Sequence, residues 1–234
     1  TGTPQDFLVE LADYDGGGQT DVLDNLTPET TAGHADFLGE EFLVGGESSS
    51  FDTFKLNMGF ANDTRNRAIF PDRGAIQRIS GEIALPGGDL EYYKFTYLNQ
   101  RYFKLTRDMT LSLKGEIGYG DVYGSTENLP FFENFLAAGS RSVRCYEDNT
   151  LGPRIRDTNS SSFENPLGGN LKTVASAELI FPVPFVKDDR SWRFTAFVDA
   201  GNVFGADEDF GIGELRYSTG LGVTWLSPFG ALTA

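Results

Sequence analysis

Several features that define common protein classes are scarce in this chain of 234 residues. It has one cysteine and one histidine, which excludes an internal disulfide framework and gives no basis for a Cys–His catalytic pair. Asp and Glu (34) outnumber Lys and Arg (19), and the resulting net charge of -15 argues against nucleic-acid binding. No apolar run approaches the roughly 20 residues of a membrane-spanning helix, and no signal peptide opens the chain.

Glycine and aromatic residues are abundant instead. The chain has 28 glycines and 13% aromatic residues, as expected for a transmembrane β-barrel with tight turns and interfacial aromatic side chains. A search for apolar runs does not detect such barrels, because their strands have only about 9–11 residues and half of these face a polar lumen. A secreted β-sandwich has a similar composition, so composition alone leaves both folds open.

From residue 53 onward, apolar and polar side chains alternate with the period of a β-strand. Seven segments show this pattern: 54–60, 79–85, 93–97, 109–119, 172–181, 192–199 and 216–225. Short turns at Pro86-Gly87-Gly88 and Pro182-Val183-Pro184 are expected at one end of the sheet. The long segments 61–75, 120–170 and 201–214 are expected at the other end, which is the layout of an outer-membrane barrel. The first fifty residues show no convincing alternation and are predicted to form a long loop.

The most distinctive segment is 129–153, which is too rich in aromatics and glycine for a solvated linker. It contains Phe132-Glu133-Asn134-Phe135, Ala137-Ala138-Gly139, Val143-Arg144-Cys145-Tyr146 and Asn149-Thr150-Leu151-Gly152-Pro153. In this order the motifs resemble the large loop of the BamA-like family of outer-membrane barrel assembly factors, also called the bacterial surface antigen family. Leu226-Ser227-Pro228-Phe229-Gly230 resembles the same family. Cys145 departs from it, because the family has glycine there.

This resemblance implies an all-β fold, an antiparallel transmembrane β-barrel with a long loop inserted in the lumen. About seven of the family's roughly sixteen strands are expected in this chain, numbers eight to fourteen. Residues 1–52 are expected to form an extracellular loop region and residues 53–234 a partial barrel, with the large loop at about 120–170.

The resemblance also implies a function. The chain is expected to belong to a central component of outer-membrane protein assembly, located in the bacterial cell outer membrane, without enzymatic activity or cofactor. Its expected partners are unfolded outer-membrane protein clients and the lipid bilayer. Accessory assembly lipoproteins are expected to bind through periplasmic domains outside this chain. No nucleic-acid partner is expected.

In the family, the loop arginine pairs with carboxylates on the inner wall of the barrel. Arg144 is the matching arginine, and Glu178 and Asp199 are the matching acids, each on the polar face of a predicted strand. A planar guanidinium can bind two carboxylates at once, which a lysine does not reproduce. The loop motif adds Val143, Cys145, Tyr146, Gly152 and Pro153. Cys145 replaces a glycine expected to need positive φ or a close backbone approach, as an introduced or tolerated substitution.

Two other functions are consistent with parts of the sequence. One is a related TamA-like or two-partner secretion barrel that translocates a different client. The other is a secreted calcium-binding β-domain used in adhesion, based on the acidic tract from Asp13 to Asp24. That tract spaces its oxygens like a calcium loop, but Gly17 stands where a third side-chain ligand belongs. We therefore predict a solvated acidic loop and no metal site.

Overall fold

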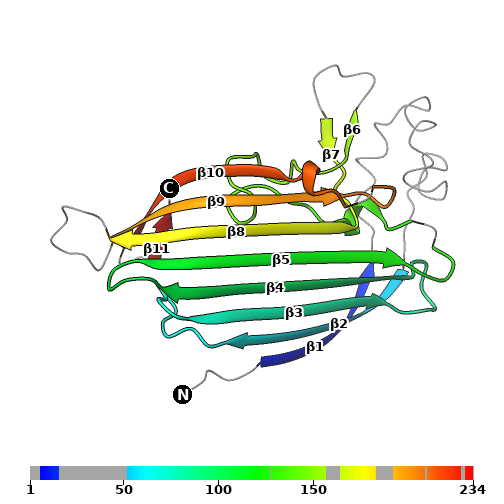
Figure 1. Ribbon diagram of the computed structural model, residues 1–234. Coiled ribbons are helices and arrows are strands. Elements are labelled where there is room, and N and C mark those ends of the chain that lie inside the picture. The colour runs from blue at the N-terminus through cyan, green and yellow to red at the C-terminus, as the bar shows by residue number, and fades with distance from the viewer. Residues whose placement is uncertain are drawn as a thin grey trace.

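The computed structural model describes residues 6–15, 52–126, 128–156, 164–182, 192–208, 210–227 and 230–233. Within these ranges one antiparallel sheet has the order β1-β2-β3-β4-β5-β8-β9-β10-β11 (Figure 1). Its strands are β1 (Asp6–Asp15), β2 (Asp52–Asp63), β3 (Gly74–Ala84), β4 (Tyr92–Lys104), β5 (Thr110–Val122), β8 (Leu171–Pro182), β9 (Trp192–Phe204), β10 (Arg216–Ser227) and β11 (Gly230–Thr233). A separate pair, β6 (Arg154–Arg156) and β7 (Glu164–Pro166), lies in the connection between β5 and β8. Among the described residues, two 3-10 helices cover Phe131–Glu133 and Ile212–Glu214.

The seven predicted strands are β2, β3, β4, β5, β8, β9 and β10, so the antiparallel all-β prediction is confirmed. The prediction of a loop over the first fifty residues is wrong for residues 6–15. These form β1, which pairs with β2 from Asp6↔Ala61 to Asp15↔Asp52. The alternation in β1 is weak because Leu8 falls on the same phase as Asp6. The remainder of the first fifty residues lies outside the described ranges.

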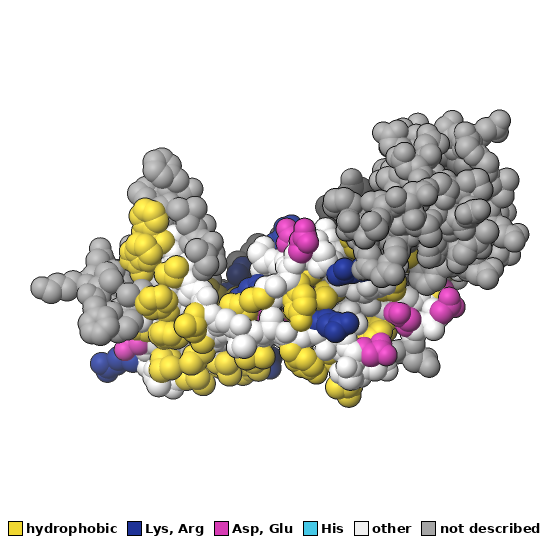
Figure 2. Space-filling view, turned by 90° about the horizontal axis from the view of Figure 1, so that it is seen from above, with side chains coloured by type: hydrophobic (Ala, Val, Ile, Leu, Met, Phe, Trp, Pro, Cys, Tyr) yellow, Lys and Arg dark blue, Asp and Glu magenta, His cyan; other side chains and the backbone are white. Residues whose placement is uncertain are grey.

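The two faces of the sheet differ in chemistry, as the alternation predicts. Successive residues of a strand point to opposite faces. Ile117 of β5 and Val198 of β9 are 50% and 54% exposed on one face, whereas Lys55 of β2 and Asp199 of β9 are 8% and 0% exposed on the other. Figure 2 shows hydrophobic side chains gathered along one side of the molecule. We call these the apolar face and the polar face.

The predicted placement of the connections is partly wrong. Because every strand reverses direction, successive connections lie at opposite ends of the sheet. Residues 85–91, with the Pro86-Gly87-Gly88 turn, therefore lie at the same end as the large β5–β8 connection (123–170) and residues 205–215. Residues 64–73 lie at the other end. There Phe70 lies over Arg193 of β9, with its ring centre 5.1 Å from the guanidinium carbon.

The large β5–β8 connection, which we call the large loop, packs residues of its 129–151 part on the polar face, and these form the buried core there. One apolar cluster joins loop residues to β8 and β9, and comprises Ala137, Ala138, Val143, Leu151, Val174 and Val203. A second cluster comprises Ala84, Leu90 and Tyr92, with Val122, Leu129 and Phe132 packed against it. No helix in the described part of the chain has the length and apolar character needed to cross a membrane.

Candidate functional site

Neighbouring strands β8 and β9 present carboxylates at adjacent positions on the polar face. Ser176 of β8 is directly opposite Asp199 of β9, and Glu178 is directly opposite Phe197. The Ser176 hydroxyl donates a hydrogen bond of 2.6 Å to the Asp199 carboxylate. The two acids are therefore diagonal neighbours, close enough for one cation to reach both.

The large loop delivers Arg144 to these acids through its packing and a tight turn. Val143 is fully buried against Val174 and Val203, which fixes the residue just before Arg144. The turn that precedes Val143 is closed by hydrogen bonds from Gly139 N–H to the Val143 carbonyl (3.1 Å) and from Ser142 N–H to the Gly139 carbonyl (3.1 Å). The next side chain, that of Arg144, therefore lies along the wall of the sheet.

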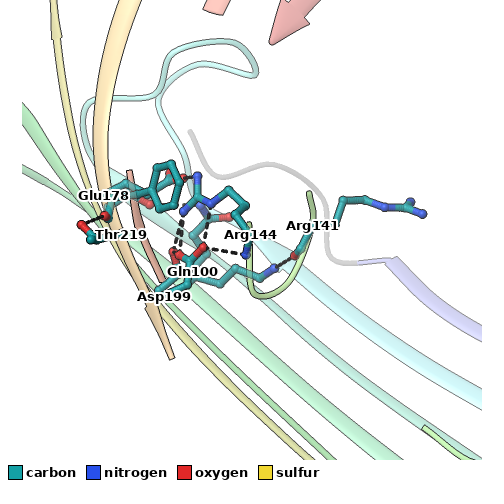
Figure 3. Close-up of polar contacts among 10 residues, drawn as sticks. Gln100, Arg141, Arg144, Glu178, Asp199 and Thr219 are labelled. Carbon is teal, nitrogen blue, oxygen red and sulfur yellow. Dashed lines mark hydrogen bonds and ion pairs between the residues drawn. The ribbon is translucent and has the colours of Figure 1, made fainter. Parts of the chain in front are cut away.

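The guanidinium of Arg144 contacts three polar side chains of the wall, those of Ser176, Glu178 and Asp199 (Figure 3). Its Nε and Nη2 donate to the two Asp199 oxygens at 2.7 Å each, and Nη1 donates to Glu178 at 2.5 Å. Nη2 also donates to the Ser176 hydroxyl at 3.1 Å, and the Arg144 backbone N–H donates to Asp199 at 3.1 Å. The guanidinium carbon lies 3.6 Å from the centre of the Phe197 ring. This bidentate and stacked geometry is specific to arginine.

Charge compensation explains why such a group is stable in this position. Asp199 is fully buried, so an unpaired carboxylate there would carry a large desolvation cost. Burial alone lowers the pKa of the Arg144 guanidinium, but Asp199 and Glu178 outweigh burial and raise its pKa above the ordinary value. Arg144 is therefore always cationic and compensates both acids.

The remaining predicted site residues flank this arginine. Cys145 has φ of 69°, the left-handed conformation expected for a position where the family has glycine, and its side chain is exposed. The Tyr146 hydroxyl donates to the Tyr217 carbonyl of β10 at 3.1 Å. Gly152 has φ of 100°, and a Cβ there would lie 2.9 Å from Val203. The Pro153 carbonyl accepts a hydrogen bond from Leu167.

A second ionic cluster was not predicted from the sequence. Glu133, at the start of the large loop, contacts Lys55 of β2 and Lys94 of β4. Signals for it existed: Glu133 belongs to the Phe-Glu-Asn-Phe motif, and both lysines fall on the polar phase of their strands. Phe197 and Ser176, which complete the Arg144 site, were also missed.

A metal site has no structural support in the described residues. No group of three or more His, Cys, Asp or Glu side chains in these ranges is arranged to hold a metal ion. Asp13 and Asp15 of the acidic tract belong to β1 rather than to a loop, and residues 16–24 lie outside the described ranges.

The cavity beside the large loop, about 640 Å³, is lined by mixed charges that include Arg78, Lys114 and Glu178.

A sheet with one apolar face, and with a polar face to which an arginine ties a long loop, defines part of a transmembrane β-barrel with a loop in its lumen. The chain belongs to the Omp85 superfamily, whose domain matches residues 18–234. The predicted family is thereby confirmed, and the relatives and the solved structure described next confirm the partial barrel and the outer-membrane location. The alternative of a secreted adhesion domain is set aside.

Individual relatives support the same placement. The chain is 37% identical over 254 residues to the outer membrane protein assembly factor BamA of Neisseria meningitidis serogroup B, covering 96% of this chain and 32% of that protein. It is 26% identical over 167 residues to the human sorting and assembly machinery component 50 homolog, covering 69% and 34%. The chain thus spans about a third of these two relatives.

The fold is shared with a solved structure, the crystal structure of BamA from Haemophilus ducreyi lacking POTRA domains 1-3. The TM-score is 0.73 at 24% sequence identity, and the match covers 98% of this chain and 46% of that one. The polar face of the sheet therefore corresponds to the inner wall of a barrel.

Proposed function

We propose that the protein to which this barrel portion belongs folds β-barrel proteins and inserts them into the bacterial outer membrane. Its action is physical rather than enzymatic. An unfolded client must satisfy its backbone hydrogen bonds before it meets lipid, and a barrel whose seam opens offers it a strand edge. Relatives named as assembly factors and assembly machinery favour this function over a TamA-like or two-partner secretion function.

In this proposal, the partners are unfolded outer-membrane protein clients, the lipid bilayer, and accessory lipoproteins that bind periplasmic domains outside this chain. The large loop serves as an internal brace of the barrel. Arg144, Glu178 and Asp199 anchor it, and Val143, Cys145, Tyr146, Gly152 and Pro153 form the segment that the anchor holds in place.

The single observation that carries this proposal is the Arg144 network. One loop residue forms hydrogen bonds with three side chains on two adjacent strands, and one of its partners is fully buried. A solvated loop has no need of such a network. Removal of one partner of a buried ion pair costs roughly 3–5 kcal/mol, because the other charge is left unpaired. Since Arg144 and Glu178 are about one-fifth exposed, the lower end of this range applies.

The test uses the full-length protein reconstituted in lipid vesicles with an unfolded client barrel. We expect Arg144→Ala to increase chymotryptic cleavage of the large loop, which needs neither arginine, and to reduce client assembly, and Arg144→Lys to restore both only in part. The matched control is Arg141→Ala in the same loop, because the exposed Arg141 side chain points away from the site (Figure 3). If Arg144→Ala behaves like Arg141→Ala in both measurements, the anchoring role is wrong.

A further inference from the structure

Glu133 lies at the centre of an ionic cluster whose charges are the reverse of those around Arg144. One Glu133 oxygen accepts a hydrogen bond from the Lys55 ammonium at 2.5 Å, and the other accepts one from the Lys94 ammonium at 2.9 Å. The side chains of Glu133, Lys55 and Lys94 are 12%, 10% and 20% exposed. Glu82 of β3 lies 3.6 Å from Lys55 and accepts a hydrogen bond of 2.8 Å from Tyr92. One loop carboxylate thus binds two wall cations.

The backbone around Glu133 is fixed by its own contacts, so the carboxylate is held in position. The Glu133 N–H donates to the Pro130 carbonyl at 2.8 Å within the short 3-10 helix. The Asn134 amide donates to the Leu167 carbonyl at 3.0 Å. Phe135 and Gly169 exchange backbone hydrogen bonds of 2.7 and 3.1 Å. The start of the large loop is therefore hydrogen-bonded to the last residues of the same loop.

The wall of the sheet is shaped to receive this segment. A Cβ at Gly118 of β5 would lie 2.8 Å from the Phe135 ring, so the absence of a side chain there lets the ring lie against the strand. The Lys94 ammonium lies 5.2 Å from the centre of the same ring. Leu129 and Phe132 pack against the buried cluster of Ala84, Leu90 and Tyr92. The ionic contacts thus lie beside a buried apolar cluster.

Glu133 and Arg144 bind on opposite sides of β5. The sheet order is β2-β3-β4-β5-β8-β9, so Glu133 reaches the β2–β4 side and Arg144 reaches the β8–β9 side. Between them, the Lys114 ammonium of β5 donates to the Arg141 carbonyl of the loop at 2.7 Å. The loop therefore spans six strands of the inner wall and is bound at both ends of that span.

We propose that Glu133 is a second anchoring residue, which holds the start of the large loop to Lys55 and Lys94 independently of the Arg144 anchor. The reversed charges allow only one orientation of the loop on the wall. Exchange of the two ends would place Glu133 beside the acids of β8 and β9, and Arg144 beside the lysines of β2 and β4. Each anchor holds its own half of the loop. This inference concerns loop position alone; only its consequence for client assembly rests on the proposed function.

Local cleavage of the folded full-length protein measures each anchor separately. Chymotrypsin reports on the loop start through the aromatic residues at 131–135, and trypsin reports on the tip through Arg141. Cleavage follows the population of the opened segment when opening is fast. We expect Glu133→Gln, which keeps the size of the side chain, to raise chymotryptic cleavage within 129–136 about tenfold, as loss of a charged hydrogen bond predicts. Tryptic cleavage at Arg141 should change much less.

Two further variants separate charge pairing from packing. Glu147→Gln is the matched control, because it makes the same chemical change at an exposed position of the same loop; it should leave both cleavage rates unchanged. Glu133→Lys should open the loop start more than Glu133→Gln. The swap Glu133→Lys with Lys94→Glu should restore protection in part, because Lys55 stays beside residue 133; loss of packing alone predicts no recovery.

Three results would overturn the proposal. They are unchanged chymotryptic cleavage in Glu133→Gln, a charge swap as open as Glu133→Lys, or equal opening at both ends of the loop. The last result would mean one cooperative anchor rather than two. Since none of these measurements involves a client, failure here is distinguishable from failure of the assembly function.

Discussion

The two faces of the sheet are built from the same strands, yet burial on them is reversed relative to a water-soluble protein. On the apolar face, large hydrophobic side chains are exposed: Phe54, Met58, Ile79, Phe95, Leu113, Ile117, Val198, Leu221 and Trp225. On the polar face, charged and hydroxyl side chains are buried together with the apolar residues that pack against the large loop, among them Lys55, Ser112 and Asp199. In a water-soluble sheet packed on one face, the assignment is the opposite.

This difference shows which kind of partner each face of the sheet contacts. A contiguous exposed apolar surface of this kind marks contact with lipid or with another protein. Burial of charges on the polar face is stable because each buried charge named here has a partner there, Glu133 for Lys55 and Arg144 for Asp199. The large loop is thus the packing partner of the polar face, and the apolar face is the one that a membrane barrel turns to lipid.

The largest expected effect comes from placing a charge on the apolar face. Ile117→Arg, in the middle of β5, should destabilise the barrel in bilayers by about 2–4 kcal/mol, as arginine does near the midplane of a membrane barrel. The matched control is Ser80→Arg, because Ser80 is exposed on the polar face of β3. Urea unfolding of the full-length protein in vesicles measures both. Equal destabilisation by the two variants would contradict the assignment of the faces.

The same structure explains why a different control, Lys114→Ala, is unsuitable. The alternation of apolar and polar residues in β5 places Lys114 on the polar face. The Lys114 ammonium, however, also donates a hydrogen bond to the Arg141 carbonyl of the large loop and lies 3.7 Å from Glu116. Sequence periodicity gives the face on which a residue lies, and it gives no information about which loop atoms reach that face.

The sequence predicts those features of the fold whose signal lies within a short stretch of the chain. Seven strands and the polar phase of Glu178 and Asp199 were predictable, because alternation is a local property. Strand β1 was missed since Leu8 and Ala12 interrupt its polar phase. The ends of the sheet were misassigned because they depend on counting every strand in order.

The candidate site was predictable in a different way. Arg144 was found through the family motif, because the arginine and its acids belong to elements that periodicity does not connect. Glu133 was missed although it lies in a motif, since its partner Lys55 is 78 residues away in another strand. No spacing rule joins residues that meet only across a barrel wall.

A smaller effect tests the shape of the polar face. Gly118→Ala would bring a Cβ to 2.8 Å from the Phe135 ring, so the start of the large loop must shift. Overpacking of this kind costs about 1–3 kcal/mol. Gly115→Ala is the matched control on the same strand, because a Cβ there meets nothing within 4 Å. Thermal unfolding should show a loss for Gly118→Ala and none for Gly115→Ala; equal values would mean that the loop does not press on the wall.

Acid should weaken the polar face selectively, through Glu133. Burial alone raises the pKa of this carboxyl, but hydrogen bonds and charges from Lys55 and Lys94 outweigh burial and hold its pKa below the ordinary value of 4.5. A depressed folded-state pKa gives stability that is present above the ordinary value and lost as pH falls through the folded-state value. The difference in unfolding free energy between wild type and Glu133→Gln should therefore shrink between pH 6 and pH 3, about where carboxyls titrate. A constant difference would exclude Glu133 as the titrating group.

The smallest expected effect concerns Cys145, where the strain lies in the backbone conformation and not in a contact with either face of the sheet. Its φ of 69° is a conformation that glycine adopts without steric cost and that costs other residues about 1 kcal/mol. Cys145→Gly should therefore stabilise the protein by up to about 1 kcal/mol, less the greater entropy of glycine in the unfolded chain. Cys145→Ala is the control, because it keeps the Cβ and the strain and should leave stability unchanged. Urea unfolding of the three proteins under reducing conditions measures the difference. A gain of equal size in both variants would assign the effect to the thiol and not to the left-handed backbone.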